Sequence, residues 1–172
     1  PRKVGKVGLI YLLNHDGNIK AEATVVTRED GTVWYGSAAA SELHDMDWLT
    51  EHLPNDGSIT LENLTASWNI LLVAGPKARD LLAAVSPRST WSSQDFRWLS
   101  AKTVSLGHIK AEAMAVSFSG EVAFELHVPM EQCRAAFDLI WAAGGDFGLK
   151  PFGLRAIETM RLEKGYLHWK GD

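Results

Sequence analysis

The chain has 172 residues, enough for one sizeable core, and its 46% apolar and 22% charged residues form an ordinary globular composition that argues against disorder. A net charge of −4 without a basic block argues against nucleic acid as a partner. The single cysteine, Cys133, excludes an internal disulfide and a four-cysteine zinc site, and the longest apolar run, residues 70–74, is too short to span a membrane.

The first part of the chain predicts two consecutive β-hairpins. Asp-Gly pairs between apolar runs are a strong hairpin signal, and this part has two of them, at residues 16–17 and 30–31. The strands that these turns connect are expected over residues 6–14, 19–27 and 32–36.

A helix is expected next, over residues 41–53, with Ser41 as its N-cap. Four apolar residues recur at helical spacing and should form its buried side. They are Leu43, Met46, Leu49 and Leu53. Two strands should follow, over residues 58–65 and 68–75.

The second half of the chain mixes helices and strands without a regular repeat. Pro76 suits the first turn of a helix over residues 76–85, and a short helix is expected over 92–99. The remaining elements are strands at 102–107, 109–118 and 121–128, and helices at 130–143 and 151–165. This order predicts an α+β fold of antiparallel-rich mixed sheets with packed helices.

Two carboxylates on predicted strands are candidate site residues. Glu125 lies between Phe124 and Leu126 in the stretch SFSGEVAFELHV, where an apolar environment penalises charge. Glu22 lies in the strand over 19–27. In both cases strand alternation offers a plainer interpretation, a side chain that points to solvent.

A metal site is not expected. His44 and His52 lie on one predicted helix, but a separation of eight residues is poor for chelation. Both are better explained as residues of a solvated helix face.

Four stretches together resemble the glycine-cleavage T-protein (aminomethyltransferase) superfamily, whose members bind tetrahydrofolate. They occur in the family's order and span nearly the whole chain. The stretches are GKVGLIYLLNHDGNIKAEATVV, LLVAGPKARDLL, VSFSGEVAFELHVP and MRLEKGYLHWKGD. The likeness is strongest to the folate-binding region of dimethylglycine and sarcosine dehydrogenases, and it implies a T-protein-like folate-binding fold.

The resemblance gives Glu125 a role. It is the second glutamate of the family motif Tyr/Phe-Thr/Ser-Gly-Glu-x-x-x-Glu, which implies contact with the pterin ring. The ring N–H and the 2-amino group of a pterin are two parallel donors, and one carboxylate accepts both. Phe118 stands where the family commonly has a tyrosine beside the folate, so packing is kept while one hydrogen bond is lost.

The resemblance also assigns three further residues. Glu22 occupies the position of the T-protein aspartate near the folate N10, which implies a catalytic carboxylate with a longer arm. Arg161 matches the arginine of the LRLE motif, which implies contact with a folate carbonyl or carboxylate, or pairing with a neighbouring acid. Trp169 stands near a family aromatic at the rim of the pocket.

The resemblance implies one domain over residues 1–172, truncated at both ends, from a flavin-dependent dehydrogenase of N-methylated glycines. An upstream domain would hold FAD and oxidise the amine to an iminium, and tetrahydrofolate would capture its carbon as 5,10-methylenetetrahydrofolate. The isolated fragment would itself be inactive. The compartment would be the bacterial cytoplasm or the mitochondrial matrix.

Two alternatives remain. One is a stand-alone aminomethyltransferase of the glycine-cleavage type, which acts with a lipoyl carrier protein. The other is a folate-binding module without transfer chemistry.

Overall fold

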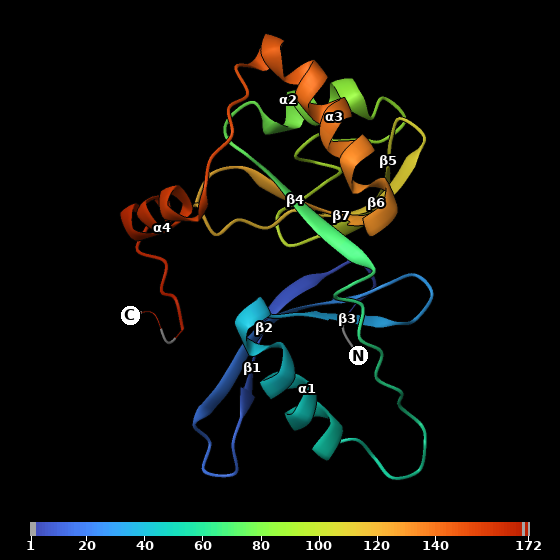
Figure 1. Ribbon diagram of the computed structural model, residues 1–172, viewed down its shortest axis with the longest axis vertical. Helices are drawn as coiled ribbons and strands as arrows, with labels where there is room; N and C mark the ends of the chain where they lie inside the picture. The colour runs from blue at the N-terminus through green and yellow to red at the C-terminus, as the bar shows by residue number, and fades with distance from the viewer. Residues whose placement is uncertain (1–2, 170, 172) are drawn as a thin grey trace. The chain divides into compact units, whose positions relative to one another are not determined.

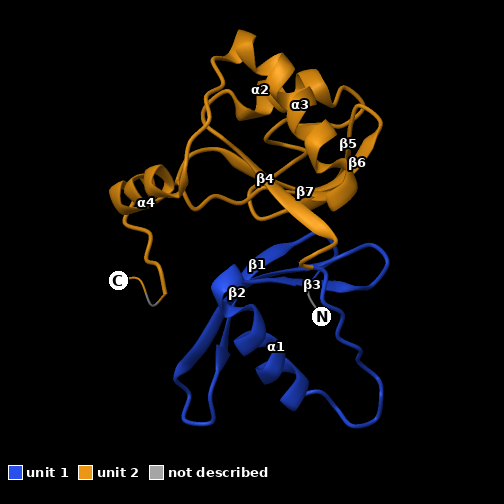
Figure 2. Ribbon diagram, in the orientation of Figure 1, with its two compact units in different colours: residues 1–64 blue, residues 65–172 orange. Residues whose placement is uncertain are grey.

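The computed structural model describes residues 3–169 and residue 171, and it confirms the predicted α+β fold of helices and antiparallel sheets (Figure 1). The chain divides into two units, Pro1–Leu64 and Thr65–Asp172 (Figure 2). Each unit contains one antiparallel sheet.

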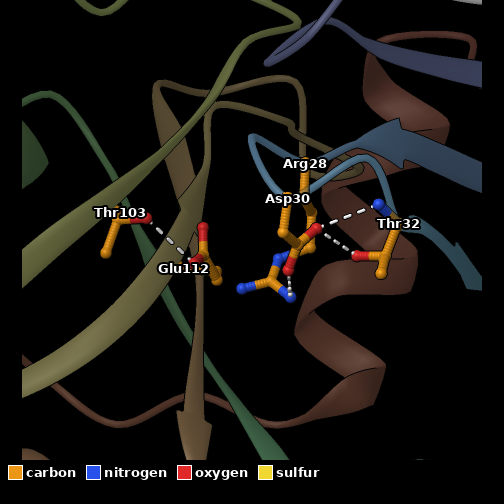
Figure 3. Close-up of polar contacts among 5 residues, drawn as sticks. All are labelled: Arg28, Asp30, Thr32, Thr103 and Glu112. Carbon is orange, nitrogen blue, oxygen red and sulfur yellow. Dashed lines mark hydrogen bonds and ion pairs between the residues drawn. The ribbon is translucent and has the colours of Figure 1, made fainter.

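The sheet of the first unit has the order β1-β2-β3, as the two Asp-Gly turns predict. Its strands are β1 (Val7–Leu13), β2 (Ile19–Thr27) and β3 (Val33–Gly36). Gly17 and Gly31 have φ angles of 82° and 84°, which only glycine adopts without strain. In the second turn, the Asp30 carboxylate accepts hydrogen bonds from the Thr32 N–H and hydroxyl and from Arg28 (Figure 3).

The first unit also contains a short 3-10 turn, η1 (Ala39–Ser41), and one helix, α1 (Glu42–Glu51). Ser41 is the N-cap residue of this helix, as predicted, although its side chain makes no capping hydrogen bond. The predicted buried side of the helix is wrong at one residue. Leu43 is exposed, and the buried side chain of α1 is Asp45.

The strand expected over residues 58–65 is absent, and this segment is irregular. Its apolar residues Ile59 and Leu61 are exposed instead of paired in a ladder. The side-chain amide of Asn63 donates a hydrogen bond to Glu42 of α1 at 2.7 Å. Alternating apolar residues form a strand only where a neighbouring strand supplies hydrogen-bond partners, and no ladder pairs this segment with a described strand.

The sheet of the second unit has the order β4-β7-β6-β5. Its strands are β4 (Trp68–Ala74), β5 (Ala101–Leu106), β6 (Ile109–Met114) and β7 (Ala123–Pro129). Helices α2 (Ala78–Val85) and α3 (Cys133–Gly144) cover one face of this sheet (Figure 1), with the short turns η2 (Met130–Gln132) and η3 (Gly145–Phe147) at the ends of α3. The core between these helices and the sheet includes the fully buried Leu82, Phe124 and Leu126.

The prediction of a helix over residues 92–99 is also wrong. The Ser92 hydroxyl donates to the Asp95 carboxylate at 2.7 Å and accepts a hydrogen bond from the Asp95 N–H at 3.1 Å. The Phe96 N–H donates to the Ser92 carbonyl at 2.8 Å, so one helical turn starts here, but it does not continue. The segment forms turns, and Leu99 has a φ of 57°. This path buries Trp91 and Phe96 against Phe124.

The last helix, α4 (Leu154–Glu163), is shorter than the predicted 151–165. It starts after Gly153, and Gly165 follows its end with a φ of 71°. Among the described residues, no helix is long and apolar enough to cross a membrane.

Candidate functional site

Glu125 lies on the face of the β-sheet opposite to the core of the second unit. Strand β7 buries Phe124, Leu126 and Val128 completely, so alternation turns Glu125 to the other face. The strand is central, and Glu125 pairs with Leu72 of β4 on one side and with Met114 of β6 on the other. Its side chain keeps 35% of its exposure. The backbone is therefore fixed on both sides while the carboxylate remains accessible.

A cavity of about 360 Å³ opens beside this carboxylate. Three parts of the second unit line the cavity: the outer face of β4 and β7, one side of α4, and two residues outside these elements, one before β7 and one after α4. The lining side chains are Leu72, Phe118, Glu125, Leu154, Ile157, Glu158 and His168. The cavity thus combines an apolar and aromatic wall with two carboxylates.

Phe118 lies in the loop between β6 and β7 and not in a strand, because β7 begins only at Ala123. The loop turns at Gly120, whose φ is 77° and where an added Cβ would overlap the side chain of Lys164. The Phe118 ring is 39% exposed and meets the His168 ring edge to face, with 5.9 Å between centroids. One wall of the cavity is therefore made by two rings from segments far apart in the sequence.

Arg161 is almost completely buried, with 2% of its side chain exposed. Its Nη2 group donates to the Glu158 carboxylate, and Nη1 donates to the Tyr166 carbonyl at 2.9 Å. The guanidinium carbon also lies 6.0 Å from the centre of the Phe118 ring. Of the two roles expected for Arg161, the structure contains the pairing with a neighbouring acid. Through Glu158 and Phe118 it supports two of the cavity walls.

Glu121 is the first glutamate of the SGEVAFE stretch, and it does not line the cavity. Its carboxylate lies 3.5 Å from the Lys164 ammonium group, and both side chains are nearly half exposed. This pair links the β6–β7 loop to the end of α4. A pair this exposed contributes little to stability.

Glu22 lies on β2 in the first unit, opposite Tyr11 of β1. The neighbouring Ala21 and Ala23 are buried, whereas Glu22 is half-buried on the other face, as alternation predicts. The charge of Glu22, with a smaller effect of burial and a hydrogen bond to the same carboxylate, raises the pKa of the Tyr11 phenol. Glu22 and Glu125 thus belong to different units of the chain.

Trp169 is half-buried and is not among the side chains that line the cavity, whereas its neighbour His168 is. Sequence reasoning also missed Glu158. Its spacing of three residues from Arg161 on a predicted helix is the signal that could have indicated a pair.

In chemical terms, this site can bind a flat, partly apolar molecule with N–H donors. A cavity of this volume suits a small ligand, and a carboxylate at an apolar wall accepts paired donors with high specificity. Within the described residues no three His, Cys, Asp or Glu side chains form a group that could hold a metal ion.

Comparisons with known proteins agree with this fold. A family model described as the GCVT N-terminal domain matches residues 1–172. Mitochondrial dimethylglycine dehydrogenase of Homo sapiens is 32% identical over 97% of the chain and 19% of the relative. Sarcosine oxidase subunit alpha of Rhizobium meliloti is 31% identical over 95% of the chain and 17% of the relative.

Among solved structures, the glycine cleavage system aminomethyltransferase T from Bartonella henselae superposes with a TM-score of 0.75 at 21% identity. The match covers 96% of the chain and 42% of the Bartonella protein. The chain spans about a fifth of the length of the two curated relatives.

Proposed function

Because the chain belongs to the GCVT N-terminal domain family, we propose that it is a tetrahydrofolate-binding, one-carbon-transfer domain of a flavin-dependent dehydrogenase of N-methylated glycines. One observation carries the proposal: the Glu125 carboxylate stands at the wall of an otherwise largely apolar cavity. The names of the two curated relatives, a dimethylglycine dehydrogenase and a sarcosine oxidase subunit, support the substrate class.

The residues present fit a reduced pterin. A cavity of about 360 Å³ is within the range of small-molecule sites. The pterin presents a ring N–H and a 2-amino group side by side, and an ionised carboxylate has enough lone pairs to accept both. Phe118 supplies an aromatic wall for the flat ring system, and Leu72 and Ile157 supply apolar contact.

The other predicted residues have supporting roles in this proposal. Arg161 holds Glu158 and lies near Phe118, so it keeps the cavity walls in place. Glu22 acts in the transfer step, where a carboxylate can accept a proton or stabilise a cation. Tetrahydrofolate supplies the pair of nitrogens that receives the one-carbon unit.

The parent protein in this proposal contains a flavin domain upstream, which holds FAD and converts the N-methylated amine to an iminium. The chain then provides the folate site that receives the one-carbon unit. We place the protein in the mitochondrial matrix of a eukaryote or in the cytoplasm of a bacterium. The word "mitochondrial" in the name of the human relative supports the first location.

Titration calorimetry of tetrahydrofolate into the full-length polypeptide that carries residues 1–172 tests the proposal. Glu125→Ala should weaken binding by about 1.5–3 kcal/mol, because a hydrogen bond to a charged group has this value and the pterin donors lose their acceptor. Glu131→Ala is a matched control, since Glu131 is an exposed carboxylate of η2 outside the cavity lining. Equal affinity of the wild type and Glu125→Ala would contradict the assignment of this site.

A further inference from the structure

His127 lies two residues after Glu125 on β7, so both side chains are on the same face of the sheet. The side chain of His127 is only 12% exposed, and its Nε2 atom lies 3.3 Å from Oε2 of Glu125. An ionised carboxylate only accepts hydrogen bonds, so this contact is a hydrogen bond in the tautomer that carries a proton on Nε2. The contact therefore restrains one oxygen of the carboxylate that opens into the cavity.

His127 is itself part of a polar row across the sheet. It lies directly opposite Glu112 of β6, and Glu112 lies opposite Thr103 of β5. The Thr103 hydroxyl donates to the Glu112 carboxylate at 2.9 Å (Figure 3). Directly opposed residues on neighbouring strands have Cβ atoms about 5 Å apart, so the row continues through His127 to Glu125.

The restraint matters because a glutamate side chain has three rotatable bonds. A carboxylate that must accept two parallel donors has to be held in one plane, and an unrestrained glutamate loses rotamer entropy when it binds. A bond from His127 removes part of this freedom before the ligand arrives. Oε2 still has a second lone pair for the ligand, because a carboxylate has about four acceptor sites.

We propose that His127 is a positioning residue, which orients the Glu125 carboxylate for the N–H donors of the ligand. The inference rests on the proposed function, because it assigns this orientation to tetrahydrofolate binding.

A double-mutant cycle in the full-length polypeptide tests this role, with tetrahydrofolate as the titrated ligand. His127→Leu should weaken binding about tenfold, because the donor to a charged group is lost. His127→Gln should restore near wild-type affinity, since its amide retains an N–H donor. In a Glu125→Gln background, His127→Leu should add little. His108→Leu, an exposed histidine of the β5–β6 turn, is the control.

Thermal unfolding of each variant measures any general loss of stability. A loss of orientation lowers the tetrahydrofolate affinity without lowering the thermal midpoint, and glutamine at position 127 restores the affinity. The inference alone is overturned if His127→Leu binds like the wild type, or if the leucine and glutamine variants are equally weak. An additive effect of His127→Leu on Glu125→Gln also overturns it. A wild-type protein that does not bind tetrahydrofolate overturns the proposed function, and the inference with it.

Discussion

Glu125 has apolar neighbours in the sequence, but its side chain does not lie in the apolar core. Its neighbours Phe124 and Leu126 are fully buried, yet the carboxylate itself keeps 35% of its exposure. The reason is the two-residue period of a strand, which sends adjacent side chains to opposite faces. Glu125 is therefore not a charge in the core but a charge at the wall of a cavity on the outer face.

Under the proposed function, a substitution of Glu22 distinguishes a catalytic domain from a folate-binding module without transfer chemistry. In the full-length polypeptide, Glu22→Gln should leave tetrahydrofolate binding nearly unchanged and slow one-carbon transfer by roughly 10²–10⁴-fold, the usual contribution of a general base. The measurement is the ratio of methylenetetrahydrofolate to free formaldehyde at saturating folate, with the transfer rate.

Glu29→Gln is the control for this variant, because it makes the same substitution at an exposed carboxylate of the β2–β3 turn. It should transfer at the wild-type rate. Identical product ratios in the wild type and Glu22→Gln would contradict the catalytic role of Glu22.

Helix α1 is attached to its sheet by a buried carboxylate. Asp45 is 2% exposed, and it accepts hydrogen bonds from the Tyr35 hydroxyl of β3 at 3.0 Å and from His44 at 2.9 Å. Burial alone would raise the pKa of the Asp45 carboxyl, but hydrogen bonds from three side chains outweigh burial and hold this pKa below its usual value. The three side chains are those of His44, Ser37 and Tyr35.

Asp45→Asn should lower the free energy of unfolding at neutral pH by about 1–3 kcal/mol, because buried donors lose a charged acceptor. The pKa of Asp45 in the folded state lies below its pKa in the unfolded state. The ionised Asp45 therefore contributes its full stabilisation above the unfolded-state pKa of about 4. It is lost as the pH falls through the folded pKa.

Chemical denaturation at several pH values measures this effect. The difference between the wild type and Asp45→Asn should shrink as the solution becomes more acidic than about pH 4. Asp47→Asn, an exposed residue of the same helix, should change stability little at any pH. A difference for Asp45→Asn that stays constant down to low pH would contradict a role for its charge.

The whole molecule can be tested for metal dependence. The proposed chemistry uses carboxylates and a folate, and within the described residues no group of three potential ligands could bind a metal. Treatment of the full-length polypeptide with a chelator should therefore change neither the thermal midpoint nor tetrahydrofolate affinity. Elemental analysis is the second measurement, and a stoichiometric transition metal in the purified protein would contradict this prediction.

The strands and most helices could be predicted from the sequence because their signals are local. The Asp-Gly turns and the alternation in residues 19–27 indicate the first sheet without any knowledge of neighbours. The family motif SGEVAFE likewise identifies Glu125 as a candidate from the sequence, because the spacing of its two glutamates is a local property.

Other features depend on contacts between distant parts of the chain, so local sequence patterns could not predict them. Residues 58–65 alternate like a strand but lack a partner strand, and residues 92–99 form turns that bury Trp91 and Phe96. The cavity beside Glu125 is also non-local, because Leu72, Glu158 and His168 reach it from segments far apart in the chain. The burial of Asp45 in place of Leu43 has the same cause. A partner on another strand, here Tyr35, determines which side of a helix is buried.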